Sequence, residues 1–249
     1  MRATAKVTVQ DQALGQRECE LQLLVSKPSV ADQTGADRSA RLSGRALLLP
    51  TSSEPKGYGL YSYLLFDTPP KDDLERERYL KSLESYLLVL QPIEELERHR
   101  RRSELNITLI PVKRNIELPD DLSSRTQAAK AAEQVLSVYD YARASALLAN
   151  LGKQVVQSGP FLVSVRPTVS NPGTLFLFFD MSRVTPKLVW DWVRAFCSLA
   201  AQERSWSEIE LKRLALNIRN ILAVAAKATP EVLGALQQWI QVVKAHEGQ

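Results

Sequence analysis

Between residues 57 and 67, an apolar, aromatic-rich run is followed by a long segment in which apolar residues recur every three or four positions. The run predicts a buried strand, and Thr68-Pro69-Pro70 predicts the turn at which the following helix begins. This helix would be amphipathic, because one face carries Tyr79, Leu80, Leu83, Tyr86, Leu87 and Leu90. Pro92 ends the pattern and favours a second short helix over residues 93–102, since proline is tolerated in the first turn of a helix but not in its interior.

Two further apolar runs predict strands before and after this unit. Residues 44–50 form a short apolar run that a proline closes, and residues 104–114 are rich in β-branched side chains. Strand, helix and strand therefore follow one another, which indicates a β-α-β unit. The alanine-rich segment 124–151 predicts one long packing helix that Gly152 stops, with one side formed by Ala129, Ala132, Leu136, Tyr139 and Leu147.

The last part of the sequence predicts a hairpin and then helices. Residues 161–167 and 174–180 are apolar runs separated by a short, turn-rich connection, so an antiparallel pair is expected. Helix starts are marked by Thr185-Pro186, by a capping box from Ser207 to Glu210 and by Thr229-Pro230. The last of these helices would carry an apolar face of Val232, Leu236, Trp239, Ile240 and Val243.

Together these elements predict an α/β protein (mixed α+β) with a mixed sheet of about five to seven strands, packed helices and a helical C-terminal third. Three regions are expected. Residues 1–43 hold two predicted strands and a polar, turn-rich stretch, and form either a loop or an ordered appendage. Residues 44–183 form the mixed α/β core, and residues 184–249 form a helical region packed on that core.

The composition is that of an ordinary globular protein, with 45% hydrophobic and 24% charged residues in a chain of 249. A net charge of +4 from 32 basic and 28 acidic side chains gives a mildly basic surface, so nucleic acid is not the expected partner. Cys19 and Cys197 are too far apart in the sequence to indicate a disulfide framework. The first residues lack the apolar centre of a secretory signal, and no apolar run reaches the roughly 18 residues that cross a bilayer. We therefore expect a soluble, cytoplasmic protein.

The sequence does not contain the common site motifs. Gly57-Tyr58-Gly59 precedes a strand instead of joining a strand to a helix, and Gly152-Lys153 is followed by glutamine, so neither indicates a phosphate loop. His99 and His246 are the only histidines, which excludes a multi-histidine metal site. Neither histidine is well placed as a catalytic base, because one stands among arginines and the other lies close to the C-terminus. We expect neither a metal nor a cofactor.

The arginine run around His99 favours a structural role. Residues 71–102 hold eight basic and eight acidic side chains, and the late basic residues are Arg98, Arg100, Arg101 and Arg102. Acids near the start of a helix and cations near its end complement the helix dipole, at about 0.3–1 kcal/mol for each charge. A helix-end role is therefore preferred over binding of nucleic acid or another polyanion.

Charged residues at the predicted strand ends give the sharpest indication of a binding site. Asp67, Arg114, Arg166 and Asp180 each follow or end an apolar run, and they would form a charged crevice if their strand ends share one edge of the sheet. The competing interpretation is that a charge only solvates the point where a strand leaves the core. Asp67 has a further possible role as a helix cap.

The sequence favours a ligand- or protein-binding component of a larger assembly. The alternative is a hydrolase or transferase in which Asp67 and Asp180 act as general acid and base, and a weak nucleic-acid binder is the third hypothesis. Trp190 falls outside the centre of its helix's apolar face, so Trp190 and Trp239 are the expected residues of a partner surface unless the chain's own helices cover them. The substrate or ligand, any catalytic residues, the identity of the partner and homo-oligomerisation stay open.

Overall fold

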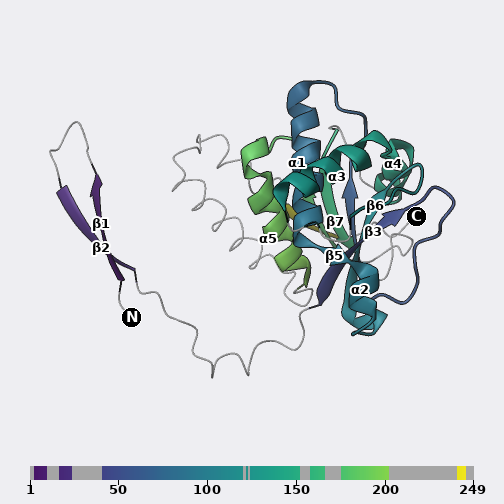
Figure 1. Ribbon diagram of the computed structural model, residues 1–249, viewed down its shortest axis with the longest axis horizontal. Helices are drawn as coiled ribbons and strands as arrows, with labels where there is room; N and C mark the ends of the chain where they lie inside the picture. Colours follow the sequence, from purple (N-terminus) through teal and green to yellow (C-terminus); the bar gives the residue numbers. More distant parts are fainter. Residues whose placement is uncertain are drawn as a thin grey trace. The chain divides into compact units, whose positions relative to one another are not determined.

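The computed structural model describes residues 41–119, 122, 124–151, 158–165 and 175–201, together with strands at 3–9, 17–23 and 240–244 (Figure 1). The chain divides into two compact units, Met1–Ser39 and Ala40–Gln249. In the first unit, β1 (Ala3–Val9) and β2 (Arg17–Leu23) pair antiparallel over their whole lengths. The alternation of apolar and polar residues in both segments is typical of such strands.

Among the described residues of the second unit, seven strands form one sheet in the order β5-β3-β6-β4-β7-β8-β9. The parallel half contains β3 (Leu42–Leu48), β4 (Leu60–Leu65), β5 (Gln91–Pro92) and β6 (Leu105–Pro111). The antiparallel half continues from β4 through β7 (Phe161–Val165), β8 (Leu175–Asp180) and β9 (Ile240–Lys244). This arrangement confirms the predicted α/β fold with a mixed sheet and the predicted antiparallel pair of β7 and β8.

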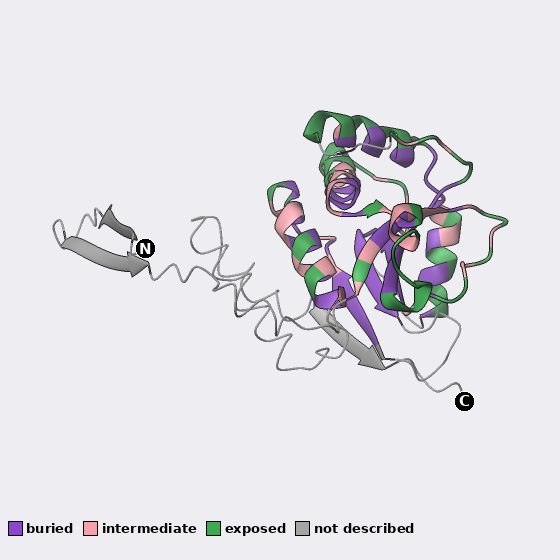
Figure 2. Cartoon of the chain, turned by 60° about the horizontal axis from the view of Figure 1, so that its bottom comes forward, coloured by how far each residue is buried: buried purple, intermediate pink, exposed green. Residues whose placement is uncertain are grey.

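The helices pack on the sheet and on one another. In Figure 1, α1 (Asp73–Val89) is flanked by α3 (Arg125–Ser137) and α5 (Val189–Ala201), and it contacts both. α4 (Tyr141–Asn150) contacts β4 and β6, and α2 (Ile93–Glu97) contacts β3. The short 3-10 helices η1 (Arg102–Glu104) and η2 (Pro186–Leu188) precede β6 and α5. Figure 2 shows the central strands buried and the helices exposed along their outer sides.

β4 and α1 form the centre of the core, as the sequence predicts. Every residue of β4 is buried, and the stacked rings of Phe66 and Tyr79 lie 4.1 Å apart. α1 is capped by Asp72, whose side chain accepts a hydrogen bond from Glu75 N at 2.7 Å. Leu80 is half-buried, and the rest of the predicted apolar face is buried: Tyr79, Leu83, Tyr86, Leu87 and Leu90.

The predicted single helix over residues 124–151 is wrong, because the structure has two helices there, α3 and α4. Between them lies Tyr139, whose hydroxyl donates a hydrogen bond to Leu64 O and accepts one from Phe66 N, both at 2.9 Å. Asp140 then caps α4 by accepting a hydrogen bond from Arg143 N at 3.0 Å. The break is fixed by contacts with β4, whose residues lie more than 70 positions earlier in the chain.

The predicted short helix over residues 93–102 is too long, because α2 ends at Glu97. Glu94 and Glu95 lie in its first turn and Arg98 is its C-cap, so the dipole argument applies to these residues. Arg102 lies in η1 instead, where its Nε is 2.7 Å from Oε1 of Glu97. Of the four arginines, Arg98 therefore stands at the end of α2 and Arg102 forms an ion pair.

The structure describes part of the predicted C-terminal helical region. α5 has the predicted apolar face, with buried residues that include Val189, Trp192, Val193, Phe196 and Leu199. The predicted helix starts at Ser207 and Thr229 lie outside the described residues. Ile240 and Val243 were expected on a helix, and this prediction is wrong because both lie in β9, paired antiparallel with β8. β-branched residues suit a strand, and the pairing covers an edge of β8 that would otherwise be open.

Candidate functional site

The strand directions decide which of the predicted charges lie together along one edge of the sheet, meaning the edge formed by the carboxyl ends of parallel strands. β6, β4 and β8 run in one direction and β7 runs in the opposite one. Asp67, Arg114 and Asp180 therefore stand at strand ends along the same edge, and Arg114 is exposed there. The carboxyl end of β7 lies at the opposite edge, and Arg166, the residue after it, lies outside the described residues.

At the carboxyl ends of β4 and β8, Asp180 forms a turn with Ser182. This turn and the end of β4 both contact the segment that precedes β7. Oδ1 of Asp180 accepts hydrogen bonds from Ser182, from N at 2.9 Å and from Oγ at 2.6 Å. Ser182 Oγ also accepts from Gly159 N at 3.2 Å, and Asp67 N donates to Ser158 O at 3.0 Å. The carboxylate of Asp180 is therefore engaged in holding the segment that leads into β7.

Tyrosine hydroxyls hold the segment before β4 onto the sheet. Tyr61 donates to Pro55 O and Tyr63 donates to Oε1 of Glu54, both at 2.7 Å. Burial raises the pKa of Tyr63 well above its ordinary value, and the neighbouring carboxylate of Glu54 raises it further. These buried hydroxyls have the polar partners that they require, so their role is structural.

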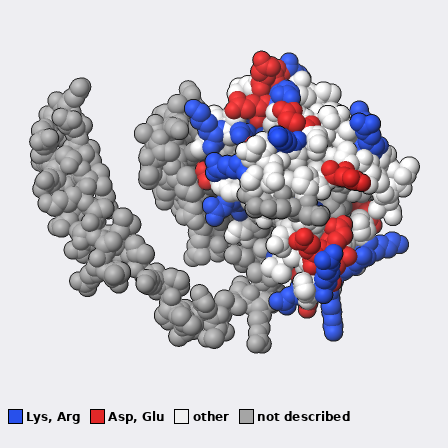
Figure 3. Space-filling model, viewed as in Figure 1, with Lys and Arg blue, Asp and Glu red and all other residues white. Residues whose placement is uncertain are grey.

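The arginine-rich segment after α2 lies among acidic side chains. Glu97 accepts hydrogen bonds from the hydroxyl of Tyr58 and from Arg102, whose guanidinium lies 5.4 Å from the centre of the Tyr58 ring. The hydrogen bond from Tyr58 lowers the pKa of Glu97, and Arg102 lowers it further against the opposing effect of burial. On the face shown in Figure 3, basic and acidic side chains are intermingled.

Only one of the two tryptophans predicted for a partner surface lies among the residues that the structure describes. Trp190 is half-buried on α5, whereas Trp239 lies outside the described residues. Trp192, on the same helix as Trp190, is buried and packs edge-to-face on Phe179 with ring centres 5.8 Å apart. α5 therefore anchors one tryptophan in the core and keeps the other at its margin.

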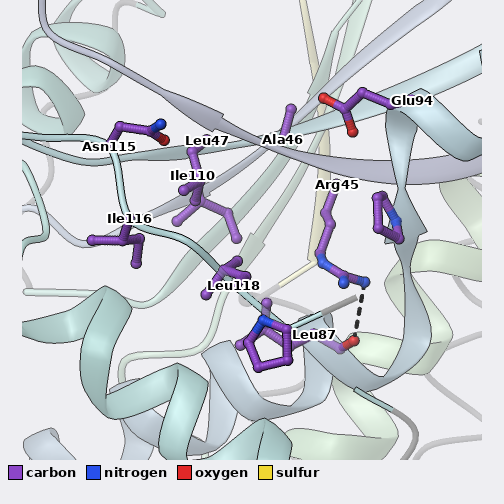
Figure 4. A pocket seen from close by; sticks show the side chains of 11 residues that line it. Arg45, Ala46, Leu47, Leu87, Glu94, Ile110, Asn115, Ile116 and Leu118 are labelled. Carbon is purple, nitrogen blue, oxygen red and sulfur yellow. Dashed lines mark hydrogen bonds between the residues drawn. The ribbon is translucent and has the colours of Figure 1, made fainter. Parts of the chain in front are cut away.

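A pocket of about 280 Å³ lies beside β3, close to the point where the short strand β5 ends (Figure 4). Its lining comes from β3, α1, β6, the junction of β5 with α2, and the loop that follows β6. The apolar lining includes Leu47, Leu87, Ile110, Ile116 and Leu118. The polar lining consists of Arg45, Glu94 and Asn115. The pocket thus combines apolar walls with a few polar groups, as small-molecule sites commonly do.

Arg45 brings a charge into this pocket, and it is only 7% exposed. Its Nη1 donates to Leu87 O at 3.3 Å (Figure 4) and also to Leu90 O, two carbonyls at the C-terminal end of α1. A cation at this end complements the helix dipole. Burial lowers the pKa of Arg45, and the carboxylates of Glu95 and Glu94 act in the opposite direction. An arginine in a protein keeps its charge even so.

Two nitrogens of the Arg45 guanidinium have no hydrogen-bond partner among the described residues. Within the described ranges, Arg45 takes part in no ion pair, and its hydrogen bonds all come from Nη1. A guanidinium has five N–H donors, so those on Nε and Nη2 are not engaged by the described residues. A structural role as a cap of α1 accounts for Nη1 but not for these remaining donors.

The sequence interpretation placed the binding site at strand ends and missed Arg45. The residue lies inside the apolar run 44–50, which predicts only a strand. The sequence does indicate that Arg45 is unusual, because a charged residue within a buried strand requires a partner. The partners come from α1, whose C-terminal end reaches Arg45 only in the folded chain.

Comparison with protein-family models, curated proteins and solved structures found no match. In the described part of the chain, no helix is long and apolar enough to span a membrane. The same residues contain no group of three or more His, Cys, Asp or Glu side chains placed to hold a metal ion. Among the described residues, the pocket at Arg45 is the feature on which we base a proposed function.

Proposed function

We propose that the protein binds a small organic carboxylate in the pocket lined by Arg45. The observation that supports this proposal is a buried guanidinium that two backbone carbonyls hold through Nη1, while its other donors have no partner among the described residues. Burying a charge is costly unless it is paired, so an anion that enters the pocket recovers part of that cost. A carboxylate suits the fork of donors on an arginine, because it accepts two parallel hydrogen bonds.

The walls of the pocket favour a ligand with an apolar body. Leu47 and Ile110 project from neighbouring strands, and Ile116 and Leu118 lie on the loop that closes the pocket. The volume of about 280 Å³ lies just below the range of about 300–1,000 Å³ that is usual for ligand pockets. A short, branched aliphatic acid therefore matches the site better than a nucleotide or a sugar phosphate.

Binding can be tested by isothermal titration calorimetry with isovalerate and with isovaleramide, a neutral ligand of the same shape. We expect isovalerate to bind at least about tenfold more tightly, because a hydrogen bond to a charged group contributes about 1.5–3 kcal/mol. Arg45→Met should lose at least as much affinity for isovalerate. Arg76→Met is the matched control, since Arg76 is an exposed arginine of α1 that pairs with Glu133.

Two results would overturn the proposal. One is equal affinity for the acid and the amide, since the guanidinium would then contribute nothing to recognition. The other is unchanged isovalerate binding by Arg45→Met. Because Arg45 also caps α1, the circular dichroism spectrum and the unfolding midpoint of the variant are needed to show that it is folded under the conditions of the titration.

A hydrolase or transferase that uses Asp67 and Asp180 is the second candidate, and the edge that β4 and β8 share supports it. The engagement of Asp180 by Ser182 gives that carboxylate a structural role instead. A screen with p-nitrophenyl acetate and p-nitrophenyl phosphate tests this candidate. Turnover by the full chain that disappears in both Asp67→Asn and Asp180→Asn would favour it over the binding function.

A further inference from the structure

Among the described residues, the outer edge of β3 is covered by another strand over only part of its length. β5 pairs with β3 at Gly44 and Arg45, and the pairing goes no further. On its other side, β3 pairs with β6 over the whole of its length. Edge strands that present unpaired N–H and C=O groups are templates for the addition of another strand.

The hydrogen-bond pattern shows which backbone groups face the uncovered edge. Leu48 O accepts a hydrogen bond from Val112 N at 2.9 Å, so Leu48 directs its backbone groups toward β6. In a parallel strand, successive residues direct these groups to opposite sides, and Leu47 therefore directs its N–H and C=O away from β6. Among the described residues, no backbone hydrogen bond outside the regular elements involves Leu47, and β5 ends before reaching it.

The pocket lies along this uncovered edge. Its lining includes three consecutive residues of β3, Arg45, Ala46 and Leu47, whose side chains alternate between the two faces of the sheet. The lining by all three residues, together with Pro92 at the end of β5, places part of the pocket beside the strand edge that β5 leaves uncovered.

We propose that the natural occupant is the C-terminal end of a partner polypeptide, which adds antiparallel to β3 as a short strand beyond the end of β5, so that its last residue lies nearest to Arg45. Its main chain exchanges hydrogen bonds with Leu47 N–H and C=O, and its terminal carboxylate binds the free donors of Arg45. Its last side chain lies against the apolar walls formed by Ile110 and Leu118. This inference rests on the proposed function, because it uses the same guanidinium as the carboxylate site.

A peptide accounts for more of the pocket than a simple acid does. A branched aliphatic acid can engage Arg45 and the apolar walls, but it has no N–H donor and no second acceptor for the edge of β3. One residue of an extended peptide supplies both groups, at the spacing that a strand requires. The charge of Arg45 then selects a free C-terminus over an internal segment of a chain.

The probe is the peptide acetyl-alanyl-valyl-valine, titrated against the full chain. Two modified peptides test its two kinds of contact. The C-terminal amide removes the charge, and N-methylation at both valines removes the main-chain donors of these two residues while keeping the carboxylate. We expect each modified peptide to bind at least about tenfold more weakly than the parent. We also expect the parent peptide to compete with isovalerate and to shift the amide resonance of Leu47 in an NMR spectrum.

The outcomes separate this inference from the proposed function. If the N-methylated peptide binds as well as its parent, strand addition is refuted while the carboxylate site stands. If the peptide binds without displacing isovalerate, the peptide occupies another surface and the inference fails. If neither the peptide nor isovalerate binds, both proposals fall. A second copy of the chain as occupant would appear as concentration-dependent dimerisation that the peptide reverses, and this result would also overturn the inference.

Discussion

The hydroxyl of Tyr139 accepts a hydrogen bond from Phe66 N at 2.9 Å, and the rings of the two residues lie 4.6 Å apart. The same hydroxyl donates to Leu64 O. One side chain therefore satisfies a backbone donor and a backbone acceptor where β4 ends, and no solvent can replace it because Tyr139 is buried. This contact joins the break between α3 and α4 to the central strand of the fold.

Tyr139→Phe should lower the free energy of unfolding by about 1–3 kcal/mol, because a buried N–H and a buried C=O each lose their partner while the ring is kept. Urea unfolding monitored by circular dichroism measures the loss. Tyr141→Phe is the matched control, since Tyr141 is half-buried and its hydroxyl makes no hydrogen bond with the described residues. Equal losses of unfolding free energy in the two variants would show that the hydrogen bonds of the Tyr139 hydroxyl do not stabilise the protein.

Leu83→Ala should destabilise the protein by about 2–5 kcal/mol, as the removal of a buried leucine side chain generally does. Leu83 is fully buried on the face of α1 that packs into the core. Leu74 lies on the same helix and is 54% exposed, so Leu74→Ala should change the stability by about 0.5 kcal/mol or less. Comparing the two urea midpoints separates core packing from helix propensity, and similar losses would contradict the assignment of the buried face.

The parts of the fold that the sequence predicts correctly are those fixed by local pattern. The apolar run of β4, the turn after it and the three-to-four spacing in α1 each reside within a few neighbouring residues. The break at Tyr139 depends on contacts with Phe66, which lies 73 positions earlier. β9 depends on pairing with β8, which lies about 60 to 70 positions earlier, and its apolar residues are also compatible with one helical face.

For the candidate site, too, local features could be predicted from the sequence, whereas features that depend on contacts between distant residues could not. Strand ends can be located in a sequence, so Asp67 and Asp180 were found, but the edge they share follows from the strand order. Arg45 could not be assigned to a pocket, because the end of α1, the end of β5 and the loop after β6 surround it only after folding. The charge inside an apolar run was visible, whereas the partners of that charge were not.

The ion pair at Glu97 gives a prediction about pH. The pKa of Glu97 is lowered in the folded protein, first by the hydrogen bond from Tyr58 and then by Arg102. A carboxyl group with a lowered folded-state pKa stabilises the protein above its unfolded-state value and loses this effect as pH falls through the folded-state value. The stability difference between the wild type and Glu97→Gln should therefore be positive at pH 7 and shrink below about pH 4.5.

Urea midpoints of both proteins between about pH 7 and pH 3 measure this difference. Glu117→Gln serves as the control, because Glu117 is exposed and makes no ion pair with the described residues. A difference for Glu97→Gln that stays constant across the pH range would mean that the charge of the carboxylate is not what stabilises the contact with Tyr58 and Arg102.

A chain of polar side chains crosses the centre of the sheet, where apolar packing would be the ordinary choice. The amide of Asn106 donates to Ser43 Oγ at 3.0 Å, and its oxygen accepts from Ser62 Oγ at 2.9 Å. Ser62 is also hydrogen-bonded to Ser164 on the next strand. Asn106, Ser62 and Ser164 are buried, so each depends on the others for its polar partners. This network ties β3, β6, β4 and β7 to one register.

Asn106→Ala and Ser62→Ala should each destabilise the protein by about 1–3 kcal/mol, because each leaves a buried polar group without its partner. The double variant should cost less than the sum of the two, since the second substitution removes the group that the first leaves unpaired. We expect a coupling free energy of about 0.5–3 kcal/mol from urea unfolding of the four proteins of this cycle. A second cycle pairs Ser62→Ala with Ser137→Ala, an exposed serine of α3 that bonds to Gln134 O, and it should be additive. Additivity in both cycles would mean that the serine and the asparagine act independently, and that the polar network does not fix the register of the sheet.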